Sequence, residues 1–364
     1  MSKTLRAIGL MSGTSLDGID VAYLETDGES VVKRGPSATY AYSAEQQAIL
    51  RQALGDALAI TDRNQRFGSL TETEQALTQW HIQAVDSFSK QHALNDSNVD
   101  VIGFHGQTVL HKPEARLTVQ LGLGQELANA TKIPVVYDMR AADVAAGGQG
   151  APLVPIYHAA LARARPCAFV NIGGVANVTF VGSAGELLAF DTGPGNALIN
   201  DWMMQHKATA FDEGGATALR GKTSQSHLAS AMAHDFFVAK PPKSLDRNAF
   251  AGLDFSALSL EDGAATMAAF TAHSIAASAK WFSATPKQWV VCGGGRHNAA
   301  IMRHLAAVLP NVVKAETLGF SGDSMEAEAW AYLAVRSLKG FPLTFPGTTG
   351  VKADLTGGVL ATPK

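Results

Sequence analysis

Cysteine, excess charge and basic clusters are all scarce in this sequence, and their scarcity excludes several classes of protein. The two cysteines, Cys167 and Cys292, lie in separate apolar runs and are too few for a metal cluster, which suits a reducing cytoplasm. The 32 acidic and 29 basic residues leave a formal charge of −3, and no block of five or more Lys and Arg occurs. Binding to nucleic acid or a membrane surface has no electrostatic support, so small-molecule chemistry is expected.

A long apolar segment is missing as well. The N-terminal residues MSKTLRAIGLMSGTS are interrupted by glycine and serine and are too polar for the apolar segment of a signal peptide. Residues 264–285 form the longest run of small and apolar residues, but His273, Lys280 and several serines favour a buried helix over a membrane span. We therefore expect a cytoplasmic protein without a transmembrane segment.

Apolar residues are otherwise plentiful, at 46% of the 364 residues. A chain of this composition buries a large core and does not match the profile of disordered proteins. Its length exceeds the roughly 250–300 residues at which a single core stops growing, so two domains are expected, with one compact barrel as the alternative.

The first part of the chain alternates between strand-like and helix-like patterns. Runs of β-forming residues, a turn at Asp27-Gly28 and apolar periodicity define the expected elements. Strands are expected at 5–10, 19–25, 30–42, 100–104, 117–121 and 133–137, and helices at about 43–57, 68–94 and 122–131. This alternation indicates an α/β domain.

The same pattern restarts near residue 167. Three strand-like runs at 167–172, 175–181 and 186–190 precede a helical stretch that begins near Asn196. Two halves that each begin with strand, glycine-rich turn, strand, turn and strand suggest an ancient duplication with a cleft between the halves. Coincidence is the alternative, because the two halves match in layout rather than in identity.

Two segments look like nucleotide-binding loops but lack a required glycine. In GGATALRGKTS, Ala216 stands where a phosphate-binding loop of the Walker type needs its first glycine, and no strand precedes the segment. In GLGQEL, Leu127 stands where a dinucleotide fingerprint needs its third glycine. Nicotinamide binding is therefore unsupported.

The segment GLMSGTSLDGID, residues 9–20, is more informative. Its glycines allow close approach of the backbone to a ligand, and Ser12, Thr14 and Ser15 add hydroxyl donors suited to an anion. Asp17 and Asp20 could hold a hydrated Mg²⁺ beside that anion. The alternative is a simple hairpin turn between two strands.

Two further glycine-rich segments each follow an apolar strand. In FDTGPGN, Asp191 at a strand end above a glycine-rich turn is well placed as a general base, and the next helix N-terminus favours a phosphate. In VVCGGGRHN, the three glycines at 293–295 let a planar ring or a phosphate lie against bare backbone. An Asx-turn and an ordinary strand-to-helix turn are the respective alternatives.

Three further polar residues are less distinctive. A histidine next to a glycine, as His105 is next to Gly106, is more often a structural turn residue, and Arg140 could pair with a substrate carboxylate or with Asp138 or Asp143. Glu326 lies in the first turn of an expected helix, where the helix dipole alone would favour a carboxylate.

Three glycine-rich loops that each follow a strand resemble the two phosphate segments and the adenosine segment of the acetate kinase, sugar kinase, Hsp70 and actin superfamily. Seven motifs in order then resemble the anhydro-N-acetylmuramic acid kinase family. They are GLMSGTSLDGID, FHGQTVLHKP, GGQGAPLVP, NIGGVANVT, FDTGPGN, CGGGRHN and GFSGDSMEAEAWA. The similarity covers nearly the whole chain and thins at 28–100 and 206–285.

This resemblance implies a fold and a reaction. The implied fold is α/β, with two duplicated actin-like (ribonuclease H-like) domains of mixed sheets flanked by helices around an interdomain cleft. The first domain would contain 1–135 with roughly 340–364, and the second 136–339. The implied reaction uses ATP, Mg²⁺ and water to convert 1,6-anhydro-N-acetylmuramic acid into N-acetylmuramic acid 6-phosphate during cell-wall recycling. A cytoplasmic homodimer is expected. Another sugar or carboxylate kinase of the superfamily, or a non-catalytic sugar sensor, is the alternative.

The resemblance also implies roles for residues within the matching motifs. Asp191 would be the catalytic base, and Asp17 and Asp20 would address the metal, possibly through water. The residues expected to bind ATP are Gly13, Thr14, Ser15, Leu16, Asp17, Gly18, Ile19, Asp20, Gly173, Gly174, Gly193, Gly195, Asn196, Gly293, Gly294 and Gly295. The residues expected to bind the sugar are His105, Gln107, Arg140, Asp143 and Glu326. Ala141-Ala142 and residues 245–250 depart from the family pattern, which puts the grip on the lactyl carboxylate in doubt.

Overall fold

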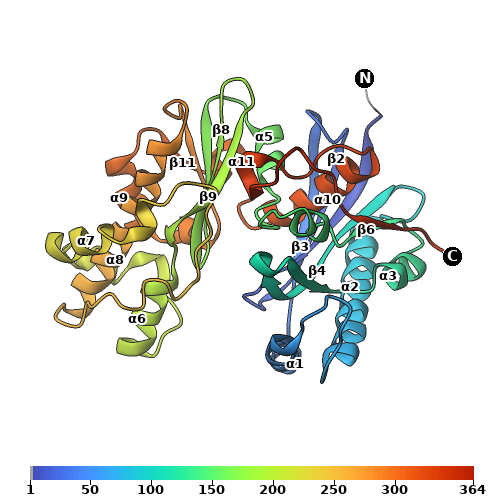
Figure 1. Cartoon of the computed structure of the whole chain (residues 1–364), viewed down its shortest axis with the longest axis horizontal. Helices are drawn as coiled ribbons and strands as arrows, with labels where there is room; N and C mark the ends of the chain where they lie inside the picture. Colours follow the sequence, from blue (N-terminus) through green and yellow to red (C-terminus); the bar gives the residue numbers. More distant parts are fainter. Residues whose placement is uncertain (1–2) are drawn as a thin grey trace. The chain divides into compact units, whose positions relative to one another are not determined.

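The computed structural model describes residues 3–364, and the chain divides into two compact units (Figure 1). The first unit contains the chain up to Leu161 together with Ser324–Lys364, and the second contains Ala162–Asp323. Residues 1 and 2, which begin the expected first domain, lie outside the described residues. The chain thus passes between the units twice, after Leu161 and after Asp323.

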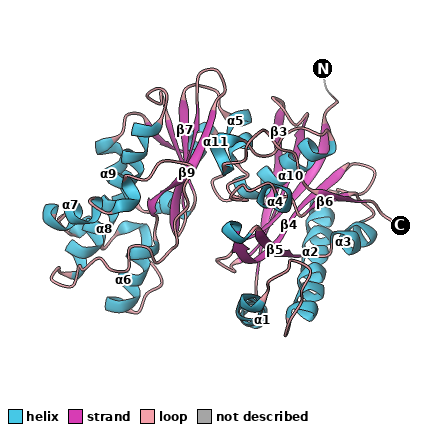
Figure 2. Ribbon diagram, viewed as in Figure 1, coloured by secondary structure: helices cyan, strands magenta, loops and turns pink. Residues whose placement is uncertain are grey.

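A seven-stranded mixed sheet forms the centre of the first unit (Figure 2). Its strands are β1 (Leu5–Ser12), β2 (Gly18–Thr26), β3 (Val32–Ala41), β4 (Val101–Lys112), β5 (Leu117–Leu121), β6 (Val135–Tyr137) and β12 (Val359–Ala361). They lie in the order β12-β6-β4-β1-β2-β3, and β5 pairs with β4. Strands β1, β4 and β6 are parallel, whereas β2 is antiparallel to both β1 and β3.

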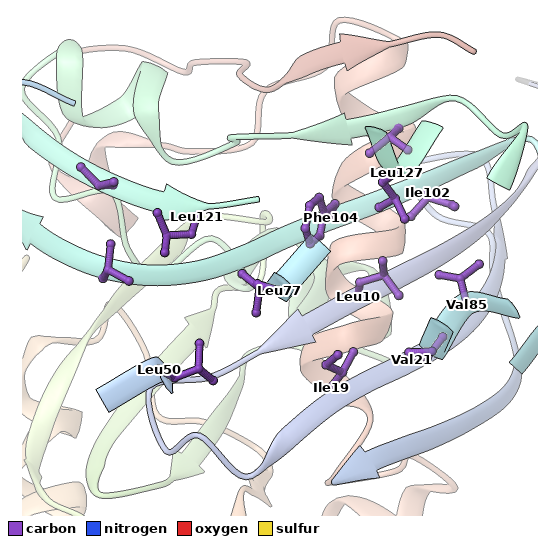
Figure 3. Packing of buried hydrophobic residues seen from close by; sticks show 14 of the residues in the cluster. Leu10, Ile19, Val21, Leu50, Leu77, Val85, Ile102, Phe104, Leu121 and Leu127 are labelled. Carbon is purple, nitrogen blue, oxygen red and sulfur yellow. The ribbon is translucent and has the colours of Figure 1, made fainter. Parts of the chain in front are cut away.

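Helices cover both faces of this sheet. The helices of the first unit are α1 (Ala44–Asp56), α2 (Leu70–His92), α3 (Gly124–Thr131), α4 (Ala141–Ala145), α5 (Pro155–Leu161), α10 (Met325–Leu338) and α11 (Pro346–Thr349). On one face, Ile8 and Leu10 of β1 pack with apolar residues of α1, α2 and α3 such as Leu50, Leu77 and Leu127 (Figure 3). Because successive strand residues point to opposite faces, Gly9 faces the other side.

Helix α10 occupies that other face at unusually close range. A Cβ atom on Gly9 would overlap the carbonyl oxygen of Ala327, and one on Gly103 would overlap that of Trp330. These two glycines therefore let the helix backbone lie directly on β1 and β4. A domain boundary near residue 340, as expected from the sequence, differs from this arrangement, because it would assign α10 to the second domain.

The second unit contains a five-stranded sheet and its own helices. The strands are β7 (Cys167–Ile172), β8 (Val175–Val181), β9 (Leu187–Pro194), β10 (Trp289–Cys292) and β11 (Val312–Lys314), and the helices are α6 (Ala197–Lys207), α7 (Gln225–Met232), α8 (Leu260–Ala277) and α9 (Ala299–Val308). The strand order is β11-β10-β7-β8-β9. Helix α8 is buried over most of its length and packs in the core of this unit.

The two sheets share one topology. In each, a first strand pairs antiparallel with a second, the second pairs antiparallel with a third, and two later strands add in parallel on the other side of the first. The orders β3-β2-β1-β4-β6 and β9-β8-β7-β10-β11 thus correspond strand for strand. The predicted α/β class with a duplicated actin-like (ribonuclease H-like) fold is confirmed.

Three predicted elements differ clearly in extent. Strand β4, predicted at 100–104, continues to Lys112. Strand β9 continues through Asp191 to Pro194, because Gly193 and Pro194 pair with Ala176 and Val175 of β8 instead of forming a turn, so Asp191 lies within the strand rather than at its end. The apolar run at 264–285 forms a buried helix, as predicted, but α8 ends at Ala277. Within residues 3–364, no helix is long and apolar enough to cross a membrane.

Candidate active site

The first glycine-rich segment forms the loop between β1 and β2. A Cβ on Gly13 would meet Ser15 Oγ at 3.6 Å, and Met11 Cε and the Ser15 amide nitrogen at 4.0 Å, so the backbone there has room for a ligand. A Cβ on Gly18 would instead lie 2.5 Å from the Tyr40 carbonyl oxygen, so Gly18 serves packing. Thr14, Ser15 and Asp17 are exposed, whereas Leu16 and Ile19 are buried in the apolar core.

Strand β4 supports this loop from the adjacent position in the sheet. Ser12 Oγ donates a hydrogen bond to the Gly106 carbonyl (2.9 Å), and Gln107 Nε2 donates to the Gly13 carbonyl (3.2 Å). His105 Nδ1 lies 3.1 Å from the Ser12 carbonyl. The structure thus brings together two motifs that are far apart in the sequence, and Gln107 contacts the loop expected to hold phosphate.

His105, Arg140 and Trp330 form a packed cluster in the first unit. Arg140 Nε and Nη2 lie 3.2 and 3.1 Å from His105 Nε2, and the Arg140 guanidinium lies 5.1 Å from the Trp330 ring centroid. Burial, together with the positive charge of Arg140, holds the pKa of His105 well below its usual range. The imidazole is therefore neutral, with Nδ1 donating to a carbonyl and Nε2 accepting from the guanidinium.

Arg140 also interacts electrostatically with two predicted site residues. Burial lowers the pKa of Arg140 to about 10, and the negative charges of Glu326 and Asp143 act against that shift. Arg140 Nη1 donates to the Gly150 carbonyl at 2.8 Å. Four predicted sugar-binding residues, His105, Arg140, Asp143 and Glu326, therefore belong to one neighbourhood in the first unit.

Asp143 has a positioning geometry rather than a ligand-facing one. Its Oδ2 accepts from the Gly150 amide (2.6 Å), and its Oδ1 accepts from Thr349 Oγ1 (2.6 Å). The residue is 1% exposed. Both carboxylate oxygens thus accept hydrogen bonds from within the protein. Asp143 holds the loop that contains Gly150, whose carbonyl accepts a hydrogen bond from Arg140.

A cavity of about 90 Å³ lies beside this cluster, within the first unit. One of the residues that line the cavity, Asp138, has a left-handed backbone conformation with φ of +55°, which is strained for a non-glycine residue. Its carboxylate is paired with Arg63 Nη2 at 2.5 Å, although burial raises the pKa of Asp138. The lining residues are Arg63, Arg66, Glu74, Phe104, His105, Gly106, Gln120, Leu121, Gly122, Tyr137 and Asp138.

Three glycine-rich segments converge in the second unit. A Cβ on Gly195 would overlap the Gly173 carbonyl oxygen, and one on Gly295 would overlap the Ile172 side chain. Asn196 Nδ2 donates to the carbonyls of Ile172 (3.3 Å) and Gly173 (3.1 Å). The segments near residues 173, 195 and 295 are therefore in direct contact, as a shared nucleotide site requires.

The glycines of these segments differ in what they contribute. Gly293 has φ of +74°, which a side chain rarely tolerates, and a Cβ on Gly193 would overlap Ser274. By contrast, a Cβ on Gly174 or Gly294 would have no other atom within 4 Å. These last two positions therefore present open backbone, whereas packing or backbone conformation requires glycine at 193, 195, 293 and 295.

Arg296 fixes the third segment, and sequence reasoning missed this role. Its Nη1 donates to the Gly293 carbonyl at 2.9 Å, while Nε and Nη2 reach Glu316 Oε1 (2.8 Å) and Asp323 Oδ2 (2.6 Å). The side chain is 2% exposed. The position of an arginine directly after three glycines could have indicated this role. Its acidic partners, however, lie 20 and 27 residues further along the chain, so the local pattern does not show them.

Asp191 carries a strongly perturbed carboxyl group. Burial raises the pKa of Asp191 to about 6, although the Leu245 amide and the positive charge of Lys243 oppose that shift. The Leu245 amide donates to Asp191 Oδ2 at 2.8 Å. A carboxyl group with a pKa near neutral is suited to general base catalysis. Sequence reasoning identified Asp191 but missed Lys243 and Leu245.

The predicted metal site has a sparse set of protein donors. Among residues 3–364, no group of three or more His, Cys, Asp or Glu side chains is arranged to hold a metal ion. Asp20 Oδ1 accepts from Thr39 Oγ1 at 2.5 Å, and Asp17 is exposed. This donor set fits Mg²⁺, which usually binds one or two carboxylates together with water and substrate phosphates.

Comparison with known proteins gives a consistent result. A family model described as anhydro-N-acetylmuramic acid kinase matches residues 5–363. The anhydro-N-acetylmuramic acid kinase of Agrobacterium fabrum is 52% identical, with 99% of each chain covered. That of Methylobacterium nodulans is 51% identical over 99% of this chain and 100% of its own.

Solved structures resemble the chain more remotely. Component A of (R)-2-hydroxyglutaryl-CoA dehydratase from Acidaminococcus fermentans is 11% identical and covers 91% of this chain and 99% of its own, with a TM-score of 0.48. The family assignment therefore rests on the family model and the sequence relatives.

Proposed function

The chain belongs to the anhydro-N-acetylmuramic acid kinase family, and we propose that it converts 1,6-anhydro-N-acetylmuramic acid, ATP and water into N-acetylmuramic acid 6-phosphate and ADP. Besides family membership, the observation that carries this proposal is the half-buried carboxyl group of Asp191, whose pKa is raised and which lies in the same unit as the converging glycine segments. The role in cell-wall recycling follows from the substrate.

The proposed mechanism needs one base, which accepts one proton from water. Asp191 takes a proton from water, and the water oxygen forms a bond to C1 of the bridged acetal. The bond between C1 and O6 breaks, and the electron pair left on O6 attacks the γ-phosphorus while ADP leaves. An ordinary kinase deprotonates its acceptor hydroxyl, but O6 in the anhydro sugar carries no proton. The base therefore acts on water.

The proposed binding groups follow from the geometry of each unit. Gly13–Ser15 in the first unit and Gly174 and Gly294 in the second offer open backbone or exposed hydroxyl groups to ATP. His105, Arg140 and Glu326 would line the sugar, whereas Gln107 and Asp143 would act through the loops that they hold.

Magnesium is a further part of the proposal. Bound Mg²⁺ would neutralise charge on the ATP phosphates, and Asp17 and Asp20 would hold its water shell. The first glycine loop contains no lysine to supply that charge. We therefore expect turnover to require Mg²⁺, and comparable turnover in excess EDTA would remove the metal from the mechanism.

The expected homodimer also remains a proposal, which sedimentation velocity tests.

Isotope labelling tests the reaction. In ¹⁸O-labelled water, the product should carry the label on the C1 oxygen and not in the phosphate group, because water attacks carbon. Phosphorylation of a reducing sugar in preference to the anhydro sugar would favour an ordinary hydroxyl kinase, and label in inorganic phosphate would mean that water attacks ATP instead of C1.

A further inference from the structure

A short segment of the second unit, Pro241–Leu245, lies along the edge of β9 and is called the strap below. The Asp191 amide donates to the Lys243 carbonyl (3.0 Å), and the Leu245 amide donates to Asp191 Oδ2 (2.8 Å). Strand β9 is the last strand in its sheet order, so the strap pairs with its otherwise unpaired edge. The strap therefore fixes both the backbone and the carboxylate of the proposed base.

Lys243 anchors the strap to neighbouring elements. Its Nζ donates to the Phe236 carbonyl (2.7 Å) and lies 4.1 Å from the Phe236 ring centroid. The same ammonium group lies 5.9 Å from the ring of Phe190, the residue before Asp191. The ammonium group of Lys243 thus lies close to the face of the Phe236 ring, where a cation is attracted to the ring electrons.

The charges that act on the Asp191 and Lys243 side chains come from each other and from Lys280. Lys243 on the strap lowers the pKa of Asp191, and Asp191 in turn raises that of Lys243. Lys280, on the turn Ser278–Trp281 after α8, acts against the ammonium form of Lys243. Burial is the dominant cause for Lys243 and lowers its pKa to about 8. The Coulombic interaction between the two side chains therefore favours the carboxylate form of Asp191 and the ammonium form of Lys243.

We propose that Lys243 and the Leu245 amide are positioning residues for Asp191. The amide holds Oδ2 and leaves Oδ1 to take the proton from water. The ammonium group keeps the carboxylate ionised at the pH where the enzyme works. This inference rests on the proposed function, because it assigns Asp191 the role of base.

The test compares the pH profiles of turnover for Lys243→Met, Lys243→Arg and the wild type. Removing the positive charge raises the pKa of the neighbouring carboxyl group, so the acidic limb of the Lys243→Met profile should move up by roughly one pH unit. The Michaelis constants for ATP and sugar should change less than about twofold, because a positioning residue does not contact them. Lys243→Arg should return the limb toward its wild-type position.

A matched control is Lys240→Met, which removes an exposed lysine three residues before Lys243 and should leave the profile unchanged. An unmoved limb in Lys243→Met, or a loss of turnover that is independent of pH and not restored by arginine, would overturn the positioning role. Asp191→Asn separates the two ideas. If that variant stays active, the proposed base is wrong. If it is inactive while Lys243→Met keeps the wild-type profile, only the inference about the strap fails.

Discussion

Burial acts in opposite senses on two titratable residues of the candidate site. It raises the pKa of the Asp191 carboxyl group to about 6, whereas it lowers the pKa of the His105 imidazole well below its ordinary value. In both cases the charged form is disfavoured because it loses hydration. Asp191 therefore titrates just below neutral pH, while His105 stays neutral throughout the working range and serves as a hydrogen-bonding partner of Arg140.

The first prediction concerns the identity of the base. Replacing Asp191 with Asn keeps nearly the same shape but removes the proton acceptor, so turnover should fall by at least ~10²-fold. Ring opening and phosphorylation should be lost together, since O6 becomes nucleophilic only as its bond to C1 breaks. Product analysis by mass spectrometry measures both, and calorimetric titration should show that ATP binding survives. Ring opening at a near-normal rate would reject Asp191 as the base.

The second prediction concerns pH. A general base works when it is deprotonated, so turnover should decline as the pH falls through about 6, with a limiting slope of roughly tenfold per pH unit. The sign follows from the raised pKa, because protonation of Asp191 removes activity at a higher pH than for an ordinary carboxyl group. His105 cannot produce this limb, since its pKa is lowered. A steady-state pH profile with its midpoint near 4 would contradict the assignment.

At the scale of elements, glycines of similar sequence context have different structural roles. Gly9 and Gly103 admit α10, and Gly18 admits the Tyr40 carbonyl, so side chains at these positions would disturb the fold. Gly13 has room for a Cβ in the loop between β1 and β2. Of these four glycines, Gly13 is the one at which a substitution can test ligand binding without disturbing packing.

The third prediction uses that difference. Gly13→Val should fold normally but raise the Michaelis constant for ATP far more than that for the sugar, because a branched side chain keeps phosphate away from the backbone. Gly252→Val is a control, since a Cβ there meets no atom within 4 Å and the residue lies outside the glycine segments of the site. Kinetics with each substrate varied in turn measure the effect. Equal increases for both substrates would mean that the loop is only a turn.

Most strands and helices could be predicted from the sequence because their patterns are local. Alternating apolar residues and glycine-rich turns gave the three-strand start of each unit, and the motif at 191–196 identified Asp191. Local patterns do not show pairing between distant segments. The extension of β9 through Thr192 depends on its partner β8, and the contacts of Arg296 with Glu316 and Asp323 depend on how the chain returns. The Lys243 side chain is informative only once its place beside Asp191 is known.

At the scale of the whole molecule, the same limit applies to the division of the chain. The sequence expectation placed the second domain at 136–339, whereas the compact units divide after Leu161 and after Asp323. The difference arises because α10 follows the second half in sequence but packs on β1 and β4 of the first unit. The chain therefore connects the units at two points. The first follows the end of α5 at Leu161, and the second directly precedes α10.

The last prediction follows from how the proposed ATP-binding residues are distributed. Gly13–Ser15 belong to the first unit, whereas Gly174 and Gly294 belong to the second. If one ATP molecule engages both sets while a reactive water is used at C1, bulk solvent must be excluded to limit wasteful hydrolysis. We therefore expect the units to close when both substrates bind, and the radius of gyration from small-angle X-ray scattering should decrease.

The measurement is sharpest with Asp191→Asn, because this variant should hold ATP, Mg²⁺ and the anhydro sugar without turning them over. Scattering should be compared for the free protein, for the complex with ATP alone and for the complex with both substrates, at concentrations where sedimentation shows a single species. The largest decrease is expected only with both substrates, since closure on ATP alone would promote transfer to water. An unchanged radius in saturating ligands would mean that the two units already have their catalytic arrangement before substrates bind.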